Sequence, residues 1–474
     1  MWEFIGVSVI LTSNEVFMKL IRVRDDRSDL SRFSVAVLCC LSIFNSSESV
    51  SAKPQAPKNV IMFIGDGMGL ASITSARVWS KGSTGRLAME TFPITGVAKT
   101  HSSSNFVTDS AASATALASG IKTYNGAIGM TDPKLDPKRS SRPVETIFDI
   151  VGSMGKVTGV VTTTRITHAT PASYYAHVEA RSMEEEIASW LAKSSLTLAL
   201  GGGRQFFYPA SWHDVGGSKQ KGLRRDNVNL IQKMKQSGWE YASSPQELNR
   251  KDFGLKKKVL GLFNYDHLSY ERSRSRSQKV EPSLAEMVRF SINRLSSHDE
   301  GYMLLVEGGR IDHAAHANNV PDALGEVVAF DNAIAVALKE TSADDTLIVV
   351  TADHETGGMA LSGYLPLSQA KGDKIFRVQR NFLEEPTEDK RSLFTWATGP
   401  GPNRSNFKDE HTSGTAFYSE MAAHTAVDVL VLARGPGAHK FSGFMNNIDI
   451  PFRIASALNK PFTASANLVN HRQW

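Results

Sequence analysis

The chain has 474 residues, of which 41% are hydrophobic and 21% are charged, a composition that is ordinary for a folded globular protein. The formal net charge of +5 is too small over this length to predict a nucleic-acid-binding protein. One basic, Ser-rich run, Glu271–Lys279, has no interleaved aromatic residue and is typical of a solvated loop.

Residues 1–52 are predicted to lie outside the fold. From Met18 the sequence runs through a cationic segment, an apolar stretch of 12 residues and small residues ending at Ala52, which is the order of a secretory signal peptide. The apolar stretch is too short to span a bilayer, and it holds Cys39 and Cys40, the only cysteines of the sequence. We therefore expect a protein that is exported to the bacterial periplasm or the extracellular space, is cleaved near Ala52, and has no disulfide and no stable membrane insertion. The segment before Met18 would then be an unused upstream start.

The next predicted element, a strand at residues 59–64, is a continuous apolar run of the kind that is buried on both faces of a parallel sheet. Strand and helix signals then alternate along the chain. The predicted strands are residues 156–162, 196–200, 258–264, 302–306, 346–350 and 428–433, and the predicted helices are residues 144–154, 182–193, 226–238, 282–296, 321–340 and 448–458. This alternation predicts an α/β fold with a doubly wound, mostly parallel central sheet and helices on both faces, in one domain of residues 53–474.

The stretch from residue 362 to residue 421 lacks this periodicity. It is polar and contains several prolines. A segment of about sixty residues without periodicity is uncommon inside a compact domain. We interpret it as an insertion that forms a lid, an interface element or a small subdomain.

Ser110 is predicted to lie in the first turn of a helix, with Asp109 as the N-cap. Free backbone N–H groups and the helix dipole make such a position a site for phosphate or another oxyanion. The hydroxyl would be a nucleophile only if something lowered its pKa, and no histidine lies near it in sequence. A metal ion is the alternative activator. Taken alone, the stretch is equally compatible with an ordinary serine at a helix start.

Acidic residues and histidines follow the ends of several predicted strands. Because the carboxyl ends of parallel strands lie at the edge of the sheet where ligands bind, these side chains are expected to converge there with Ser110. Mixed histidine and carboxylate ligands without thiolates suit Zn²⁺, and all-oxygen sets suit Mg²⁺. The set comprises Asp66, Glu307, Asp312, Asp353 and His354, with His316 one helical turn after Asp312 and His424 just before the last predicted strand.

Six sequence strings make the chain resemble the alkaline phosphatases. In family order they read IMFIGDGMG, VTDSAASATA, ITHATPASYYAHVEAR, VEGGRIDHAAH, TADHETGG and AAHTAVDVLVLARGPGAH, and they span about residues 59–458. The resemblance implies hydrolysis of phosphate monoesters to an alcohol and inorganic phosphate through a phosphoserine. It also implies two Zn²⁺ and one Mg²⁺ per chain and a homodimer, with small phosphomonoesters as substrates.

The resemblance also implies a role for each matching residue. Ser110 would be the nucleophile, and Arg181 would hold two phosphate oxygens in a planar fork that a lysine does not offer. One zinc set would be Asp312, His316 and His424, the second Asp66, Asp353 and His354, and the magnesium set Asp66, Thr170 and Glu307.

Two histidines depart from the best-studied bacterial members of the family. His168 and His313 stand where those members have Asp and Lys, whereas animal members and some cold-adapted bacterial members have His at both positions. We hypothesise that both lie outside the direct ligand set and act on the third metal through its water shell, weakening Mg²⁺.

Three other functions remain open on the sequence. A sulfatase of the same superfamily would carry a C/S-x-P-x-R string, whereas Ser110 is followed by Ala111, Ala112 and Ser113. A nucleotide phosphodiesterase usually has a threonine nucleophile and lacks the third metal set. An exported protein that binds phosphate or zinc without turnover is the alternative from a different class.

Overall fold

The computed structural model describes residues 8–12, 15–19, 56–135, 140–213, 220–249, 253–254, 257–276, 281–362, 372, 394–400 and 414–462. The chain divides into two compact units, Met1–Lys53 and Pro54–Trp474. In the first unit, strands β1 (Ser8–Thr12) and β2 (Glu15–Lys19) pair as an antiparallel hairpin. Apart from Met18 and Lys19, the predicted signal segment and its cleavage site lie outside the described residues.

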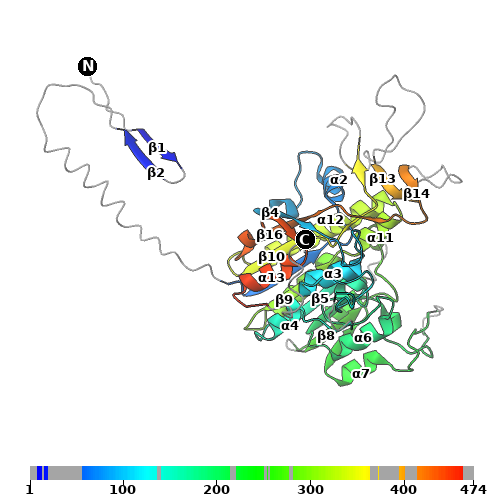
Figure 1. Cartoon of the computed structure of the whole chain (residues 1–474). Coiled ribbons are helices and arrows are strands. Elements are labelled where there is room, and N and C mark those ends of the chain that lie inside the picture. The colour runs from blue at the N-terminus through cyan, green and yellow to red at the C-terminus, as the bar shows by residue number, and fades with distance from the viewer. Residues whose placement is uncertain are drawn as a thin grey trace, which may run out of the picture. The chain divides into compact units, whose positions relative to one another are not determined.

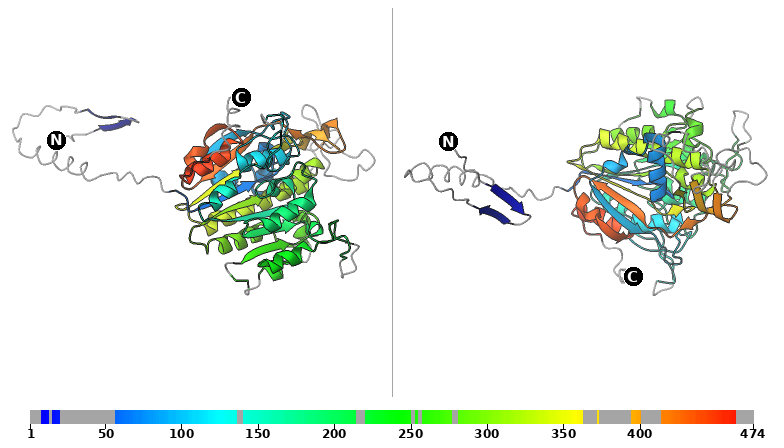
Figure 2. Two further views of the ribbon diagram at one scale, coloured as in Figure 1. Left: turned by 60° about the horizontal axis from the view of Figure 1, so that its bottom comes forward. Right: turned by 90° about the horizontal axis from the view of Figure 1, so that it is seen from above.

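A sheet of ten described strands organises the second unit, and Figures 1 and 2 show helices packed around it. Its order is β17-β4-β16-β10-β3-β9-β5-β6-β8-β7, and every neighbouring pair is parallel except the two that β16 makes with β10 and β4. The strands are β3 (Asn59–Ile64), β4 (Ile94–Lys99), β5 (Val157–Arg165), β6 (Leu198–Gly202), β7 (Trp239–Ala242), β8 (Lys258–Leu262), β9 (Tyr302–Glu307), β10 (Thr346–Thr351), β16 (Val429–Arg434) and β17 (Gly443–Asn446). The predicted α/β class and mostly parallel sheet are confirmed.

The centre of the sheet is also the centre of the core. Every residue of β3, β9 and β10 is buried, as expected for strands that are covered on both faces. Helices α2 and α10 both pack against α12, and α3, α4 and α13 form a second packed group. These helices are α2 (Leu70–Lys81), α3 (Ser110–Ser119), α4 (Ile147–Gly152), α10 (Leu284–Leu295), α12 (Val320–Glu340) and α13 (Asp449–Ala457).

Three strands of the ten-stranded sheet, and helix α2, were not predicted from the sequence. Strands β7 and β17 lie at the two edges of the sheet and β4 is next to β17, so the three bury fewer residues than the central strands and lack a continuous apolar run. Helix α2 carries a weak apolar stripe, because two of its buried residues, Ser72 and Ser75, are serines. The predicted helices and strands are otherwise present, with ends that differ by a few residues.

Part of the predicted insertion pairs with the strand that precedes it to form a small sheet. Strands β12 (Ala360–Leu361), β13 (Phe394–Gly399) and β14 (Gly414–Tyr418) pair in the order β12-β13-β14, and Figure 1 shows β13 and β14 outside the central sheet. The rest of the stretch between residues 362 and 413, apart from residue 372 and residue 400, lies outside the described residues.

The basic run is not a loop throughout, which corrects the prediction. It opens with the one-turn helix α9 (Glu271–Arg274), in which Arg274 forms a bidentate pair with Glu271 at 2.5 and 2.7 Å. The backbone N–H of Glu271 donates to the buried carboxylate of Glu326 (2.6 Å), which anchors the start of the run to α12. Within the described ranges, no helix combines the length and the apolar character that a bilayer crossing requires.

Candidate active site

Three parallel strands bring the predicted acidic residues to one edge of the sheet. Strand β3 lies between β9 and β10, with which it pairs in parallel, so the three carboxyl ends are neighbours. Asp66 follows β3 by two residues, Glu307 is the last residue of β9, and Asp353 follows β10 by two residues. The predicted convergence at this edge is confirmed.

Gly67 lets the turn after β3 approach the helix that follows β9. Its φ of 71° lies in the left-handed region, which favours glycine. A Cβ atom at this position would lie 2.7 Å from the Oγ1 of Thr356 and 2.9 Å from the Cα of Asp312. A side chain at position 67 would therefore collide with Thr356 and Asp312, and only glycine permits the close packing around Asp66.

Ser110 lies at the start of α3, as predicted. The Asp109 side chain caps the helix by accepting from the backbone N–H of Ala112 (3.0 Å). The buried hydroxyl of Ser110 lies 3.1 Å from the Nε2 atom of His354 and 3.5 Å from the Oδ1 atom of Asp66. The serine is thus held between a helix N-terminus and two of the predicted ligands.

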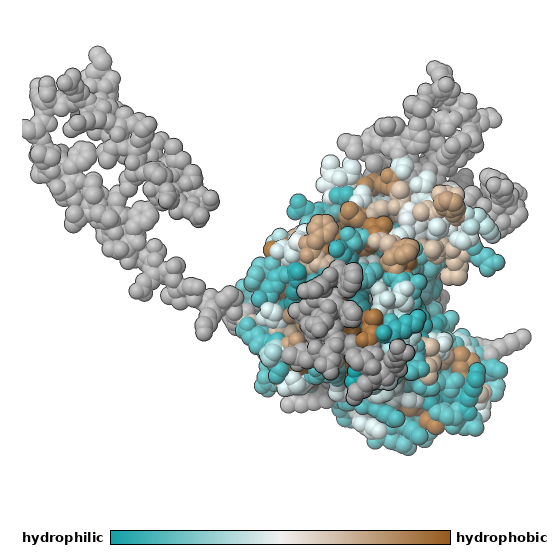
Figure 3. Space-filling view, viewed as in Figure 1, coloured by the Kyte–Doolittle hydropathy of each residue, from teal (hydrophilic) through white to brown (hydrophobic). Residues whose placement is uncertain are grey.

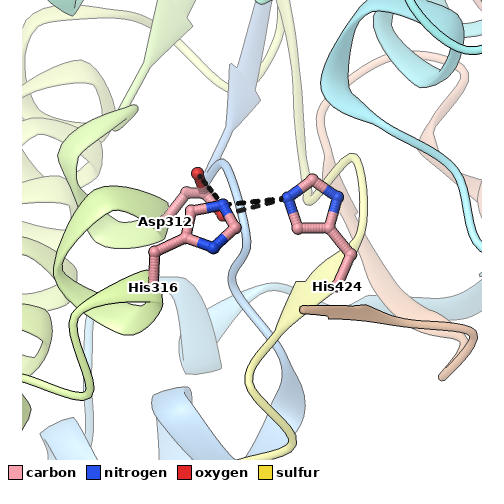
Figure 4. A group of neighbouring side chains, drawn as sticks. All are labelled: Asp312, His316 and His424. Carbon is pink, nitrogen blue, oxygen red and sulfur yellow. Dashed lines mark hydrogen bonds and ion pairs between the residues drawn. The ribbon is translucent and has the colours of Figure 1, made fainter. Parts of the chain in front are cut away.

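The first group of possible ligands joins Asp312 and His316 of α11 (Arg310–His316) to His424 of β15 (His424–Thr425), and Figure 4 shows the three side chains turned toward one another. Asp312 lies 3.2 Å from the Nε2 atom of His316 and 3.6 Å from that of His424, and the two Nε2 atoms are 3.1 Å apart. The Nδ1 atom of His316 donates to the carbonyl of Ala422 (2.5 Å), and that of His424 donates to the carbonyl of Thr108 (2.9 Å).

These hydrogen bonds fix which nitrogen of each ring can bind a cation. A neutral imidazole that donates from Nδ1 has its lone pair on Nε2. In the neutral rings of His316 and His424, two lone pairs therefore face each other beside a carboxylate. They cannot hydrogen-bond to one another, and a zinc ion bound by both nitrogens and by Asp312 fits this set of ligands.

The second group surrounds His354. Its Nε2 atom lies 3.3 Å from the Oδ2 atom of Asp353 and 3.5 Å from the Oδ1 atom of Asp66. The Oδ1 atom of Asp353 accepts from the backbone N–H groups of Gly67 (3.1 Å) and His354 (3.0 Å). Its buried Oδ2 atom has no hydrogen-bond partner among the described residues, and neither has the Oδ2 atom of Asp66. Ligand atoms of Asp312, Asp66 and His354 also lie within 4.8 Å of one another, so Asp312 is shared by the first and second groups.

Thr356 connects these two groups, and sequence reasoning missed it. Its hydroxyl donates to Asp312 (2.5 Å) and lies 3.3 Å from the Nδ1 atom of His354. Since that hydroxyl can then accept from Nδ1–H, the Nε2 lone pair of His354 faces Ser110. Thr356 belongs to the two-residue strand β11 (Glu355–Thr356), which is too short to leave a sequence signal.

The third group combines Asp66 with Glu307 and His168. Glu307 accepts from the hydroxyls of Thr162 and Thr164 on one oxygen, and its other oxygen, Oε1, is buried without a hydrogen-bond partner in the part of the chain that the structure describes. Within the described ranges, the buried Nδ1 atom of His168 also lacks a hydrogen-bond partner. Atoms of Asp66, His168 and Glu307 lie within 4.8 Å of one another, whereas the predicted set had Thr170 in the place of His168.

The remaining predicted residues lie around this group. Thr170 is buried in α5 (Ala169–Ala172), and its hydroxyl, with those of Thr162 and Thr164, offsets part of the rise that burial causes in the pKa of Glu307. Arg181 donates to Asp109 (3.1 Å) and to the Nε2 atom of His168 (2.9 Å), so its guanidinium stands beside the start of α3. The ring of His313 lies 5.5 Å from that of His168.

His267 is a further residue that sequence reasoning missed. Its ring centre lies 4.4 Å from that of His313 and 5.5 Å from that of His168. Burial, and then the charges of His313 and Arg165, lower its pKa. His267 follows β8 by five residues. Since ligands bind at the carboxyl ends of parallel strands, this position was a sequence signal that could have indicated it.

The charge of the site is unbalanced. Burial raises the pKa of Asp353 to about 8 and that of Glu307 to about 7, and burial together with the charges of Asp353 and Asp312 raises the pKa of Asp66 well above its usual value. Burial alone would also raise the pKa of Asp312, but the hydrogen bond and charge of His316 hold it well below its ordinary range. Buried carboxylates in this number need added positive charge to stay ionised together, which bound cations supply.

Comparisons with known proteins identify the family of the chain. The family model described as alkaline phosphatase matches residues 57–460. The alkaline phosphatase of Gadus morhua is 33% identical over 443 residues, covering 84% of this chain and 91% of the relative. The structure of the alkaline phosphatase from the Antarctic bacterium TAB5 has a TM-score of 0.65 and 29% identity, and covers 85% of this chain and 99% of the other. A TAB5 variant with glutamate in place of a histidine, described with Mg bound in the M3 site, has a TM-score of 0.66 and 30% identity, and covers 86% and 100%. The chain therefore belongs to the alkaline phosphatase family and is a phosphomonoester hydrolase.

Proposed function

We propose that the chain hydrolyses phosphate monoesters through a phosphoserine on Ser110, at a site that holds two Zn²⁺ and one Mg²⁺. The observation that carries the proposal is the position of the Ser110 hydroxyl, which lies at the N-terminus of α3 and 3.1 Å from the Nε2 atom of His354. Two sets would hold zinc, namely Asp312, His316 and His424, and Asp66, Asp353 and His354. Asp66, Thr170 and Glu307 would hold magnesium. When bound, two such cations stabilise the attacking and the leaving oxygen of a phosphoryl transfer.

Ser110, Arg181 and the start of α3 have different roles in the proposed reaction. The oxygen of Ser110 attacks phosphorus and loses its proton to solvent, the phosphorus–oxygen bond to the alcohol breaks, and the alcohol takes up a proton from water. Water then cleaves the phosphoserine, which restores the hydroxyl and releases inorganic phosphate. Arg181 orients two phosphoryl oxygens through its planar fork, and the free N–H groups at the start of α3 favour the anion.

One assay tests the proposed activity. Purified protein is expected to release p-nitrophenol from p-nitrophenyl phosphate, and the Ser110→Ala variant is expected to lose at least about 10³-fold in kcat, because the nucleophile is gone. A chelator should abolish turnover, and added zinc and magnesium should restore it. Faster turnover of the sulfate ester or of the bis-ester would instead assign a sulfatase or a phosphodiesterase. Binding of phosphate or zinc without turnover would assign a binding protein.

We propose that His168 tunes the third site against Mg²⁺. Magnesium prefers an all-oxygen set, and His168 lies with Asp66 and Glu307 in the third group. In the TAB5 variant an acidic residue replaces a histidine, and magnesium is bound in the M3 site. This observation supports a third metal site in the family. His168→Asp is expected to tighten Mg²⁺ binding, measured by titration, and an unchanged affinity would contradict this.

The proposed assembly is a homodimer, with the insertion at residues 362–421 as a candidate interface or rim. Large apolar side chains support it, because Phe417, Tyr418 and Met421 are 73%, 78% and 60% exposed. Figure 3 shows hydrophobic surface in the region where Figure 1 draws β13 and β14. Exposed apolar patches of this kind are typical of protein interfaces. Light scattering is expected to give twice the mass of the chain, and the mass of a monomer would contradict the proposal.

We also propose that residues 18–52 form a cleaved export signal that precedes a single domain of residues 53–474. The order of a cationic segment, an apolar stretch and a small-residue end supports this. Expression in a bacterial host is expected to yield protein outside the cytoplasm that begins near Lys53 by N-terminal sequencing. Retention of residues 18–52 in the exported protein would contradict cleavage.

A further inference from the structure

The side-chain amine of Lys122 joins two loops near the site. It donates to the carbonyl of His101, in the loop after β4, and to the Oδ1 atom of Asn447, directly after β17 (2.6 Å). Burial lowers the pKa of Lys122 to about 7, although the charge of Asp449 raises it. The neutral amine present at alkaline pH has two N–H groups, which match the two acceptors.

A chain of hydrogen bonds continues from Lys122 into the site. The side-chain amide of Asn447 donates to the hydroxyl of Ser113 (3.1 Å), and that hydroxyl donates to the backbone carbonyl of Asp353 (2.7 Å). Asn447 and Ser113 are each 1% exposed, so water does not replace these partners. Because the single proton of Ser113 goes to Asp353, the direction of the chain runs from Lys122 through Asn447 and Ser113 to Asp353.

The last bond of this chain joins the two parts of the proposed catalytic centre. Ser113 is three residues after Ser110 on α3, and Asp353 directly precedes His354. The Ser113–Asp353 bond therefore sets how far the serine-bearing helix lies from the loop that carries the ligands. In the structure that spacing leaves 3.1 Å between the Ser110 hydroxyl and the Nε2 atom of His354.

We propose that Lys122 is a positioning residue, which acts through Asn447 and Ser113 to hold the backbone of Asp353 at its distance from Ser110. The proposal rests on the proposed function of this site. It assigns Lys122 no contact with substrate or metal, and it predicts effects on zinc binding and on the chemical step rather than on folding alone. A small displacement of a reacting group from its position costs about 10²-fold in rate.

The test compares two lysines that each bridge two acceptors. Lys122→Met removes both N–H donors and keeps an unbranched side chain. Lys156→Met is the matched control, because Lys156 donates to the carbonyls of Lys58 (2.8 Å) and Glu300 (2.6 Å) and directly precedes β5, so it lies at the amino end of that strand, whereas the site lies at the carboxyl ends. We expect Lys122→Met to weaken zinc binding about 10-fold in competition with a chelator and to lower kcat with little change in KM. Lys156→Met should change neither, even where it lowers the Tm.

A second variant tests the route of the effect. In Ser113→Ala the last link is absent, so adding Lys122→Met should cause no further loss of zinc affinity, whereas independent sites would give additive losses. Lys122→Arg, which keeps N–H donors, should recover part of the zinc affinity. Wild-type zinc affinity and kcat in Lys122→Met, or a full additional loss in the Ser113→Ala background, would overturn the proposal. Failure of the wild-type protein to hydrolyse p-nitrophenyl phosphate would overturn the proposed function instead, because zinc competition does not depend on turnover.

Discussion

The Nδ1 atom of each proposed zinc-binding histidine lies against an oxygen of the protein. His316 and His424 donate to backbone carbonyls, and His354 faces the hydroxyl of Thr356. Partners of this kind fix the tautomer and the orientation of a ligand ring and raise its basicity. The three Nε2 atoms therefore point into the site before any cation binds, which lowers the cost of ordering the ligands.

Thr356 offers the sharpest test of this arrangement. Thr356→Val removes the hydroxyl that bonds Asp312 and His354 but keeps the shape of the side chain, so we expect zinc affinity to fall between about 10-fold and 100-fold. Thr356→Ser keeps the hydroxyl and should retain most of the affinity. Competition with a chelator measures both variants, and equal affinities for valine and serine would contradict the role assigned to the hydroxyl.

At the scale of elements, α3 links the stability of the fold to the orientation of Arg181. The Asp109 carboxylate caps the helix through Ala112, accepts from the backbone N–H of Gly126 (3.0 Å), and pairs with Arg181 at 3.1 Å. One side chain thus fixes the start of the helix and the guanidinium that is proposed to meet the phosphoryl group.

Substitutions of Asp109 should separate these two effects. Asp109→Ala is expected to lower the free energy of unfolding by about 1 kcal/mol through loss of the cap, and to raise KM because Arg181 loses its partner. Asp109→Asn can still cap the helix, so it should keep most of the stability while the KM still rises. Denaturant unfolding and steady-state kinetics measure the two quantities, and a KM that follows stability in both variants would argue against a role in orienting Arg181.

Short elements explain most of what the sequence did not predict. Strands β11 and β15 have two residues each, and they pair residues about seventy positions apart, Glu355 with Thr425 and Thr356 with His424. No local pattern contains such a pairing, because it arises from tertiary contact. The predicted role of His424 therefore depended on family resemblance, whereas Asp66, Glu307 and Asp353 could be predicted from their places after long buried strands.

For the whole molecule, burial on both faces decided which strands were predictable. The central strands β3, β9 and β10 are continuous apolar runs, and the acidic residues that follow them were located correctly at the sheet edge. The edge strands carry no periodic signal. The Lys122–Asn447 contact joins two loops, which carry none either. Sequence pattern thus predicted the central architecture and the proposed ligands at the strand ends, and missed the polar contacts that orient them.

The pH dependence of stability without metal follows from the same buried carboxylates. Burial raises the pKa of Asp353 to about 8 from an ordinary value of 3.8, and that of Glu307 to about 7 from 4.5. Between the ordinary and the raised values the folded state binds more protons than the unfolded state, so stability falls as pH rises through this range. We expect the Tm of chelator-treated protein to fall from about pH 4 toward pH 8.

Bound cations should reverse this trend, because they favour the ionised carboxylates and bind only the folded state. Thermal unfolding of the chelator-treated and the zinc- and magnesium-loaded protein across pH 5 to 9 makes the comparison. The difference in Tm between the two forms is expected to widen as pH rises. The Asp353→Asn variant supplies the control, because without this carboxylate the Tm of the metal-free form should fall less steeply with pH. A difference in Tm that is constant across the range would show that these carboxylates do not receive the cations.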